Sequence, residues 1–468
     1  MKVLLVRPMP HPDSIGLHKL MVCEPLELEY ASAVLKAAGH EVELADLILD
    51  RRPFGRILEE SAPDLVGFTA YLPHVGTVRA LASEAKAALP SALTMVAGVH
   101  AEVVPQDFDD PGIDFVLHAN ALTSLADLAA GLAAGRRPEE LRREIPGVWD
   151  GSGKECELDA SGRMPRPDRE LSARYRRRYN YIFHERCALV KTSFGCPYTC
   201  DFCFCARITR GKWFGRELED VVDEIAAIAE RNVFMVDDDF LIDRSRVERF
   251  CALLDARGVR KRFILFGRAD FVAQNPDTIR LLRDHGARAI FVGIESFADS
   301  ELEGMNKLSS VELNLRAVRV LEELGMECYA GIIVDPDWDR ADFAALRERL
   351  REIQRPFLNI QPLTPMPGTP AWDRLASRIA VPREAWQLWD MAHLVIRPAR
   401  LDPAEFYREL LDTYWAASVR PHMHWYILSR YGPRIWLRTV RGAMHITRQY
   451  RRLIRSPGLP VTVMEASS

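Results

Sequence analysis

The chain has 468 residues, of which 48% are hydrophobic and 27% are charged. This composition excludes collagen-like, disordered and disulfide-scaffold proteins, and no apolar run reaches the ~18 residues that a membrane-spanning helix needs. The net charge of −4 divides into +8 on residues 413–468 and −12 on residues 1–412. An acidic body with a basic tail predicts that the tail meets an anionic partner.

The length predicts several domains, because single cores stop growing near about 250–300 residues. In residues 1–148, short apolar strands alternate with helical patterns, and Gly39 closes the first predicted helix, residues 26–37. This alternation predicts an α/β, doubly wound, Rossmann-like domain whose parallel sheet binds its ligand beyond the carboxyl ends of the strands. The predicted strands are residues 2–7, 41–44, 64–69, 93–97 and 114–117. The apolar run at the N-terminus has only four residues, which is too short for a secretory signal.

A stretch rich in Gly, Pro and Arg, residues 149–186, is predicted to be a linker. A second strand–helix series then occupies residues 187–375. Six such units predict a partial (β/α)6 barrel with its chemistry at the carboxyl ends of the strands. The predicted strands are residues 188–192, 233–236, 263–266, 289–293, 327–334 and 358–361. Residues 376–468 are predicted to be helical.

The basic tail is predicted to include an amphipathic helix over residues 434–455. One side carries arginines 434, 438, 441, 448, 451, 452 and 455. The other side carries Ile435, Trp436, Val440, Ala443, Ile446, Tyr450, Leu453 and Ile454. Three interpretations are open: a peripheral contact with an anionic membrane surface, packing against the barrel with a solvated arginine face, or nucleic-acid binding. Nucleic acid is the least favoured, because the acidic body would repel a long duplex.

Nine cysteines, an odd and bunched set, argue against a disulfide framework and for a reduced, cytoplasmic protein with a metal site. Cys196, Cys200 and Cys203 follow the first strand of the second series. Three thiolates at this spacing can face one iron–sulfur cube and leave its fourth iron open. The alternatives are a zinc site completed by Cys205, which the single intervening residue would cramp, and unrelated buried cysteines.

The Cys-x3-Cys-x2-Cys spacing, with the aromatic Phe202 before the last cysteine, resembles the radical S-adenosylmethionine enzymes over about residues 185–375. The resemblance implies a [4Fe–4S] cluster on the three cysteines. It also implies that S-adenosylmethionine binds the open iron through its amino and carboxylate groups and yields a 5′-deoxyadenosyl radical.

The other strand ends supply the groups that this resemblance implies for S-adenosylmethionine. Asp237 and Asp239 are expected near the methionyl amino group, and Arg268 is expected to pair with the methionyl carboxylate. Glu295 and Ser296 are expected near the ribose hydroxyls. Two alternatives stay open, a solvated acidic turn for the aspartates and a structural ion pair between Arg268 and Glu295.

A doubly wound domain ahead of such a barrel resembles the cobalamin-dependent branch of the family. The implied cobalamin contacts are Thr69, Tyr71, His74, Gly98 and His100. No Asp-x-His-x-x-Gly motif is present, so no histidine is offered as a lower cobalt ligand, and residues 118–121 depart from the branch's pattern. The alternatives are a flavodoxin-like domain without a cofactor and, for His74, an ordinary exposed histidine at a helix start.

Together these features predict a cobalamin-dependent methyltransferase acting at an unactivated carbon of a lipid-like or natural-product intermediate. The rivals are a radical cyclase or rearrangement enzyme and a non-catalytic iron–sulfur or cobalamin sensor. The expected partners are a small-molecule or lipid-like substrate and an external electron donor such as flavodoxin or ferredoxin. We expect a cytoplasmic enzyme, peripheral at the inner face of the membrane through residues 434–455, that binds no nucleic acid. No residue is assigned to proton transfer.

Overall fold

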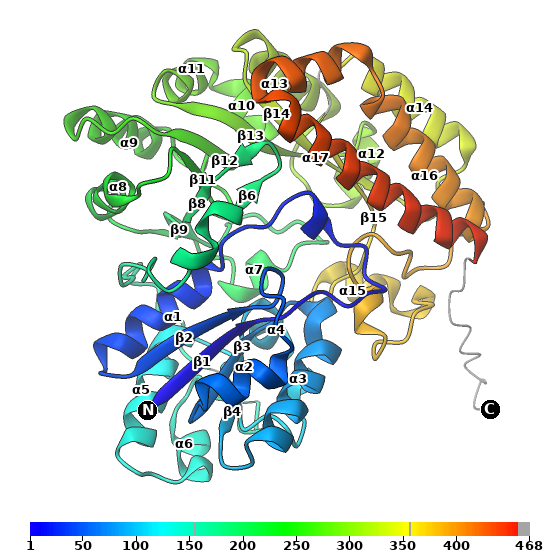
Figure 1. Cartoon of the computed structure of the whole chain (residues 1–468). Coiled ribbons are helices and arrows are strands. Elements are labelled where there is room, and N and C mark those ends of the chain that lie inside the picture. Colours follow the sequence, from blue (N-terminus) through cyan, green and yellow to red (C-terminus); the bar gives the residue numbers. More distant parts are fainter. Residues whose placement is uncertain (154–155, 355–356, 457–468) are drawn as a thin grey trace. The chain divides into compact units, whose positions relative to one another are not determined.

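The computed structural model describes residues 1–153, 156–354 and 357–456. It divides into two compact units (Figure 1). The first comprises residues 1–14, 24–178 and 383–390, and the second comprises residues 15–23, 179–382 and the chain from 391 onward. The end of the predicted C-terminal region, residues 457–468, lies outside the described residues.

The first unit is built on a five-stranded parallel sheet of order β2-β1-β3-β4-β5. The strands are β1 (Lys2–Arg7), β2 (Glu41–Asp46), β3 (Leu65–Thr69), β4 (Leu93–Ala97) and β5 (Phe115–Val116). The helices are α1 (Leu26–Ala37), α2 (Phe54–Ser61), α3 (Val75–Ala88), α4 (Val99–Val103), α5 (Ala121–Ala133) and α6 (Pro138–Glu144). The predicted doubly wound sheet is confirmed. Its order reverses between β1 and β3, and a fold of this kind binds ligands beyond such a point.

The second unit contains a six-stranded parallel sheet of order β15-β14-β13-β12-β11-β8. The strands are β8 (Cys187–Val190), β11 (Asn232–Met235), β12 (Arg262–Arg268), β13 (Ala287–Glu295), β14 (Glu327–Val334) and β15 (Phe357–Pro362). The intervening helices are α8 (Leu218–Ala227), α9 (Arg244–Ala256), α10 (Ala269–Gln274), α11 (Pro276–Asp284), α12 (Asp299–Gly304), α13 (Val311–Glu323) and α14 (Arg340–Arg351). Neighbours in the sheet are neighbours in sequence, and this confirms the predicted partial barrel.

Two short antiparallel pairs flank this sheet. One joins β6 (Asn180–Tyr181) to β7 (His184–Glu185), and the other joins β9 (Ser193–Phe194) to β10 (Phe214–Gly215). The short helix α7 (Cys205–Ile208) lies within the loop between β9 and β10. The second pair therefore brings together the two ends of the loop that carries the cysteine motif.

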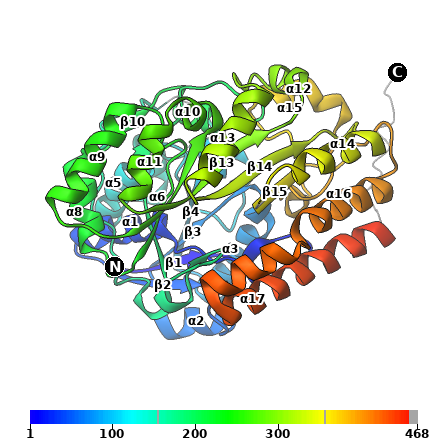
Figure 2. The same ribbon diagram turned by 90° about the horizontal axis from the view of Figure 1, so that it is seen from above.

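The chain ends in the helices α15 (Pro370–Leu375), α16 (Pro403–Ser418) and α17 (Pro421–Arg455). The last two lie side by side (Figures 1 and 2). Helix α17 bends at Gly432, where φ is 83°, and Pro433 follows it. Tyr450 is buried, and Ile446, Leu453 and Ile454 pack against the core of the second unit. The interpretation that the apolar side of this helix packs against the barrel is therefore correct for these four residues. Their side chains are not available to insert into a membrane.

The division of the chain differs from the predicted boundaries. Much of the expected linker belongs to the first unit, because Arg169 and Arg176 form ion pairs of 2.6 and 2.9 Å with the buried carboxylate of Glu24. In the other direction, residues 15–23 join the second unit, where Val22 forms a β-bridge with Asn180. Charge pairing and strand pairing between distant segments set these boundaries, and neither is visible in local composition.

Candidate functional site

The cysteine motif lies in a loop whose base is held by the β9–β10 pair. The rings of Phe194 and Phe214 stack across this pair with 5.3 Å between centroids. Gly195, directly before the motif, has a φ of 78°, and a Cβ there would lie 2.1 Å from the carbonyl oxygen of Lys212. Only glycine satisfies both the positive φ and the close approach. The start of the motif loop is therefore fixed at the carboxyl end of β8.

The three thiols of the motif are partly buried and act on one another electrostatically. Burial raises the pKa of Cys196 to about 11, and the negative charges of Cys203 and Cys200 add to this shift. Burial also raises the pKa of Cys200. Thiolates that repel one another in a partly dry loop need a shared cation to be stable. This donor set fits the irons of a cluster.

The zinc alternative needs Cys205 as a fourth ligand beside the three thiols of the motif. Across the described residues, no group of three or more His, Cys, Asp or Glu side chains is spaced to hold a single metal ion. Zn–S bonds of about 2.3 Å require sulfurs within about 4 Å of one another, whereas each thiolate of a [4Fe–4S] cube binds a separate iron. Cys205 also has another partner, since its thiol donates to Oδ1 of Asp238 at 3.6 Å.

Asp237 holds the turn that follows β8. Its buried carboxylate accepts from the backbone N–H of Thr192 at 2.6 Å, from the hydroxyl of Thr192 at 2.5 Å and from the N–H of Ser193 at 3.2 Å. Both oxygens are thus engaged with the protein. The interpretation of these aspartates as a solvated acidic turn is wrong, because Asp237 and Asp239 are 1% and 2% exposed.

Asp239 carries a carboxylate oxygen that the protein leaves unsatisfied. Its Oδ1 accepts from the N–H of Leu241 at 3.1 Å, whereas its buried Oδ2 has no hydrogen-bond partner among the described residues. Burial raises the pKa of Asp239 to about 7. An unsatisfied buried acceptor is costly and calls for a ligand donor. The negative charge of Asp239 acts on Cys196, so an amino group bound beside the motif could supply that donor.

Arg268 and Glu295 do not pair with each other, so the predicted alternative of an ion pair between them is wrong. Arg268 pairs with Asp270 at 3.0 Å, and its guanidinium lies 3.7 Å from the ring centroid of Tyr198. Among the described residues its Nη1 makes no hydrogen bond, and this leaves one donor rather than a fork for a ligand carboxylate. Glu295 pairs with Lys307 at 2.7 Å.

The Glu295–Lys307 pair lies at the strained end of β13. Glu295 has a φ of 60°, a conformation that costs about 1–3 kcal/mol in a non-glycine residue and is often found at functional sites. A Cβ at Gly293 would lie 2.4 Å from Oε1 of Glu295, so a larger residue there would displace this carboxylate. Sequence reasoning missed Lys307, because no local pattern marks it. Ser296 donates to Glu301 and accepts from the N–H of Ala298 at 3.0 Å.

Lys307 lies close to the cysteine motif, beside the ring of Phe202. The Nζ of Lys307 lies 6.0 Å from the centroid of the Phe202 ring, and its positive charge acts on Cys200 and Cys203. A cation beside two thiolates lowers the cost of their ionisation. The structure therefore brings together Cys196, Cys200, Cys203, Phe202, Asp239, Arg268 and Glu295, and adds Tyr198 and Lys307.

In the first unit, the ends of β3 and β4 meet closely. Gly98 has a φ of 121°, and a Cβ there would lie 2.7 Å from the carbonyl oxygen of Ala70 and 3.3 Å from Oγ1 of Thr69. Glycine is therefore required at this point, because the backbones beyond the carboxyl ends of both strands pack directly against each other.

Tyr71 and His74 follow β3 in the first unit. Tyr71 is 47% exposed, and its ring meets that of His74 edge-on at 5.9 Å. His74 is half-buried, so the alternative of an ordinary exposed histidine is wrong. Its Nδ1 is buried and has no partner within the described chain. Burial and the nearby Arg7 lower the pKa of His74 to about 4, so the imidazole is neutral near pH 7.

His100 is engaged within the first unit. It is 4% exposed, and its Nε2 lies 2.7 Å from Oδ2 of Asp107, which also pairs with Arg383 at 2.9 Å. This network ties residues 383–390, far along the chain, to the first unit. Sequence reasoning could not find Arg383, because almost 300 residues separate it from its partner.

Comparisons with known proteins match both units. The model of the radical SAM superfamily matches residues 190–350, and the model of the B12 binding domain matches residues 15–129. Hopanoid C-3 methylase of Methylococcus capsulatus is 32% identical over 91% of this chain and 81% of the relative. The anaerobic magnesium-protoporphyrin IX monomethyl ester cyclase of Cereibacter sphaeroides is 24% identical over 88% of this chain and 70% of the relative.

One solved structure shares the fold over nearly the whole chain. The cobalamin-dependent S-adenosylmethionine radical enzyme OxsB, with aqua-cobalamin and S-adenosylmethionine bound, superposes with a TM-score of 0.69. The alignment covers 97% of this chain and 72% of that chain at 17% sequence identity. The likeness supports the two-part architecture described above.

Proposed function

The chain belongs to the cobalamin-dependent radical S-adenosylmethionine enzymes, and from that premise we propose that it transfers a methyl group to an unactivated carbon of a polycyclic, lipid-like substrate. Its cofactors are a [4Fe–4S] cluster, S-adenosylmethionine and cobalamin. The observation that carries the proposal is the 32% identity over 81% of hopanoid C-3 methylase. A non-catalytic sensor has no support.

Within the second unit we assign the cluster to Cys196, Cys200 and Cys203. When bound, the three cofactors supply electrons, a carbon-centred hydrogen abstractor and a methyl group. Asp239 accepts from the methionyl amino group, because its Oδ2 lacks any other partner among the described residues. Arg268 offers its Nη1 to the methionyl carboxylate.

Two further second-unit residues, Glu295 and Lys307, are assigned as a pair to the ribose hydroxyls of S-adenosylmethionine, which they would hold when it is bound. Asp237 and Ser296 hold their turns through hydrogen bonds within the protein.

For cobalamin we assign the surface formed by the carboxyl ends of β3 and β4. Gly98 lets the ends of the two strands pack closely beside Thr69, and Tyr71 offers an exposed ring. His74 is held neutral by burial, with its Nδ1 available to a donor. His100 supports this surface from behind through Asp107.

Methyl transfer can be tested on the reconstituted enzyme with cobalamin, a low-potential reductant, methyl-labelled S-adenosylmethionine and a hopanoid. We expect a product that carries one labelled methyl group, formed together with 5′-deoxyadenosine, as measured by mass spectrometry. A product with a new ring and no labelled methyl group would instead indicate a cyclase. Cyclase activity is the second candidate, because the relative from Cereibacter sphaeroides is a cyclase. Omitting cobalamin should abolish labelling.

A lipid-like substrate would be reached most easily at a membrane surface. Over the described residues, no helix is long and apolar enough to cross a membrane. Leu437 and Met444, which are 41% and 43% exposed, alternate with the exposed Arg441 and Arg448 at helical spacing on one face of α17. We propose that this face, residues 437–448, contacts anionic lipid. The electron donor is proposed to be a flavodoxin or ferredoxin.

The lipid contact can be tested with two double variants of the full chain. Leu437→Gln/Met444→Gln removes the apolar part of the face, and Arg441→Gln/Arg448→Gln removes its charge. Each arginine near an anionic surface is worth about 1 kcal/mol, so the second variant should bind anionic liposomes roughly 30-fold more weakly in sedimentation. High salt should weaken wild-type binding, because the Debye length is about 3 Å at 1 M.

The control for the apolar variant is Met391→Gln, which removes another exposed methionine, 39% exposed, from the second unit. This control should bind liposomes like the wild type. Equal binding by all variants, or no binding of wild type at low salt, would contradict the lipid contact while leaving the methyl transfer untouched.

A further inference from the structure

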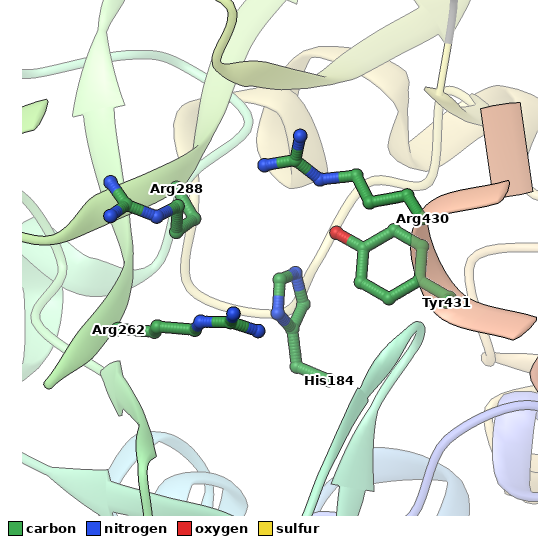
Figure 3. Close-up of a pocket in the computed structure, with 5 residues that line it drawn as sticks. All are labelled: His184, Arg262, Arg288, Arg430 and Tyr431. Carbon is green, nitrogen blue, oxygen red and sulfur yellow. The ribbon is translucent and has the colours of Figure 1, made fainter.

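A cavity of about 250 Å³ lies in the second unit at the amino ends of the barrel strands. It is lined by His184, Arg262, Arg288, Arg430 and Tyr431. Figure 3 shows the three arginines coming from different elements around His184 and Tyr431. Arg262 begins β12 and Arg288 is the second residue of β13, whereas Arg430 comes from α17. Segments far apart in sequence thus bring three guanidinium groups to one cavity.

This cavity is separate from the S-adenosylmethionine site. Strand β12 runs from Arg262 at the cavity to Arg268 beside the cysteine motif. At about 3.3 Å per residue, the two ends of this strand lie about 20 Å apart. Catalytic groups of barrels gather at the carboxyl ends of the strands. The arginines at the opposite ends are therefore not explained by the radical chemistry.

The arginines of the cavity are only partly neutralised by the protein, through the 3.7 Å contact of Arg430 with Glu327. Among the described residues, neither Arg262 nor Arg288 has a carboxylate partner, and the side chain of Arg288 donates to the carbonyl oxygens of Arg283 and Ala287. Burial lowers the pKa of Arg288, and the positive charges of Arg262 and Arg430 lower it further. Like charges gathered without a counter-ion destabilise the folded chain. The cluster is thus short of negative charge.

The carboxylate of Glu327, which accepts from the lining residue Tyr431, is already engaged with the protein. Glu327 is 2% exposed and accepts from Tyr329 at 2.7 Å and from Tyr426 at 2.8 Å. It also accepts from Tyr431 and lies 3.3 Å from Nε2 of His184. Arg430 reaches it only at 3.7 Å. A single carboxylate shared among five groups cannot balance three arginines, whose guanidinium forks suit phosphate oxygens.

We propose that this cavity is a second ligand site of the enzyme, which binds a phosphate-bearing anion through Arg262, Arg288 and Arg430. Its volume accommodates a diphosphate or the phosphorylated head of a larger molecule, but not a whole dinucleotide. Tyr431 and His184 border the same space and can donate to remaining phosphate oxygens. The ligand chemistry is shared by a soluble diphosphate and by an anionic lipid headgroup.

The test is a calorimetric titration of the full-length holoenzyme with inorganic diphosphate at low ionic strength. Arg262→Gln/Arg288→Gln should bind diphosphate roughly 30-fold more weakly than wild type. The control Arg244→Gln/Arg280→Gln removes the same charge from two exposed arginines that already pair with Glu248 and Asp277. This control should bind diphosphate like the wild type.

Thermal unfolding supplies a readout that a purely structural role would not produce. Without anion, Arg262→Gln/Arg288→Gln should melt at or above the wild-type temperature, because the variant relieves repulsion. Diphosphate should then raise the melting temperature of the wild type and the control only. A variant that melts lower and binds diphosphate as tightly as wild type would overturn the proposal.

A second arm separates the two sources of the anion. Vesicles of phosphatidic acid in phosphatidylcholine are compared with phosphatidylcholine alone, for wild type and for Arg262→Gln/Arg288→Gln. If only vesicle binding is weaker in the variant than in the wild type, the ligand of the cavity is a lipid headgroup. If only diphosphate binding is weaker in the variant, the ligand is a soluble anion. If neither probe shows a dependence on these arginines, the proposal fails.

Discussion

Replacing Cys196, Cys200 and Cys203 together with alanine is expected to abolish bound iron, the visible charge-transfer absorption and all turnover. In the proposed assignment each of these thiolates holds one iron of the cluster. Without the cluster, S-adenosylmethionine has no iron to bind and no source of electrons. Iron analysis and the absorption spectrum after anaerobic reconstitution measure the effect.

The matched control is Cys205→Ala, two residues beyond the motif. The thiol of Cys205 donates to Oδ1 of Asp238 at 3.6 Å, so its loss should leave the iron content and the absorption in place. Loss of the cluster in this control, or zinc in place of iron in the wild type, would show that the assignment of the three ligands is wrong.

Replacing Asp239 with asparagine is expected to weaken S-adenosylmethionine binding roughly 10- to 100-fold. A hydrogen bond to a charged group contributes about 1.5–3 kcal/mol, and the buried Oδ2 of Asp239 has no other partner among the described residues. Asparagine keeps the size but not the charge. Equilibrium binding to the cluster-loaded protein measures the loss, and Asp277→Asn, an exposed aspartate of α11 whose side chain is 80% exposed, is the control.

The same variant should change the pH dependence of binding. Burial raises the pKa of Asp239 to about 7, so the free protein carries a protonated carboxyl below that pH and an ionised one above it. Because the ionised form accepts from the amino group, wild-type affinity should rise as pH increases from 6 to about 8 and then level off. In Asp239→Asn this rise should vanish. An identical pH profile in both proteins would remove Asp239 from the site.

Patterns of neighbouring residues determined the architecture of this protein. The buried apolar runs of β1 and β14 predicted both strands with the boundaries that the structure has. Regular strand–helix alternation predicted two parallel sheets, and the cysteine motif sits within eight residues of sequence. These features can be predicted from local sequence, because the spacing of apolar residues along the chain reflects the periodicity of the strand or helix that they form.

Partner choice was decided by the tertiary structure. Asp237 and Asp239 are two residues apart in sequence, yet their carboxylates differ in their partners. Asp237 accepts hydrogen bonds from Thr192 and Ser193, whereas Asp239 has a buried oxygen without a hydrogen-bond partner among the described residues. Arg268 forms an ion pair with Asp270, and Glu295 forms one with Lys307. The sequence alone also allowed an ion pair between Arg268 and Glu295. Such pairings depend on distances of a few ångströms between side chains, and residue identity does not encode those distances.

The tail shows the same division. Helical spacing correctly predicted a basic amphipathic helix. Only the tertiary structure shows that Tyr450 and its neighbours pack against the core of the second unit. The same packing leaves Leu437 and Met444 exposed to solvent. The arginine cavity is beyond any local pattern, since Arg262, Arg288 and Arg430 meet through the order of the strands and the return of α17. Short-range periodicity determines elements, whereas the long-range contacts between them determine which charges meet.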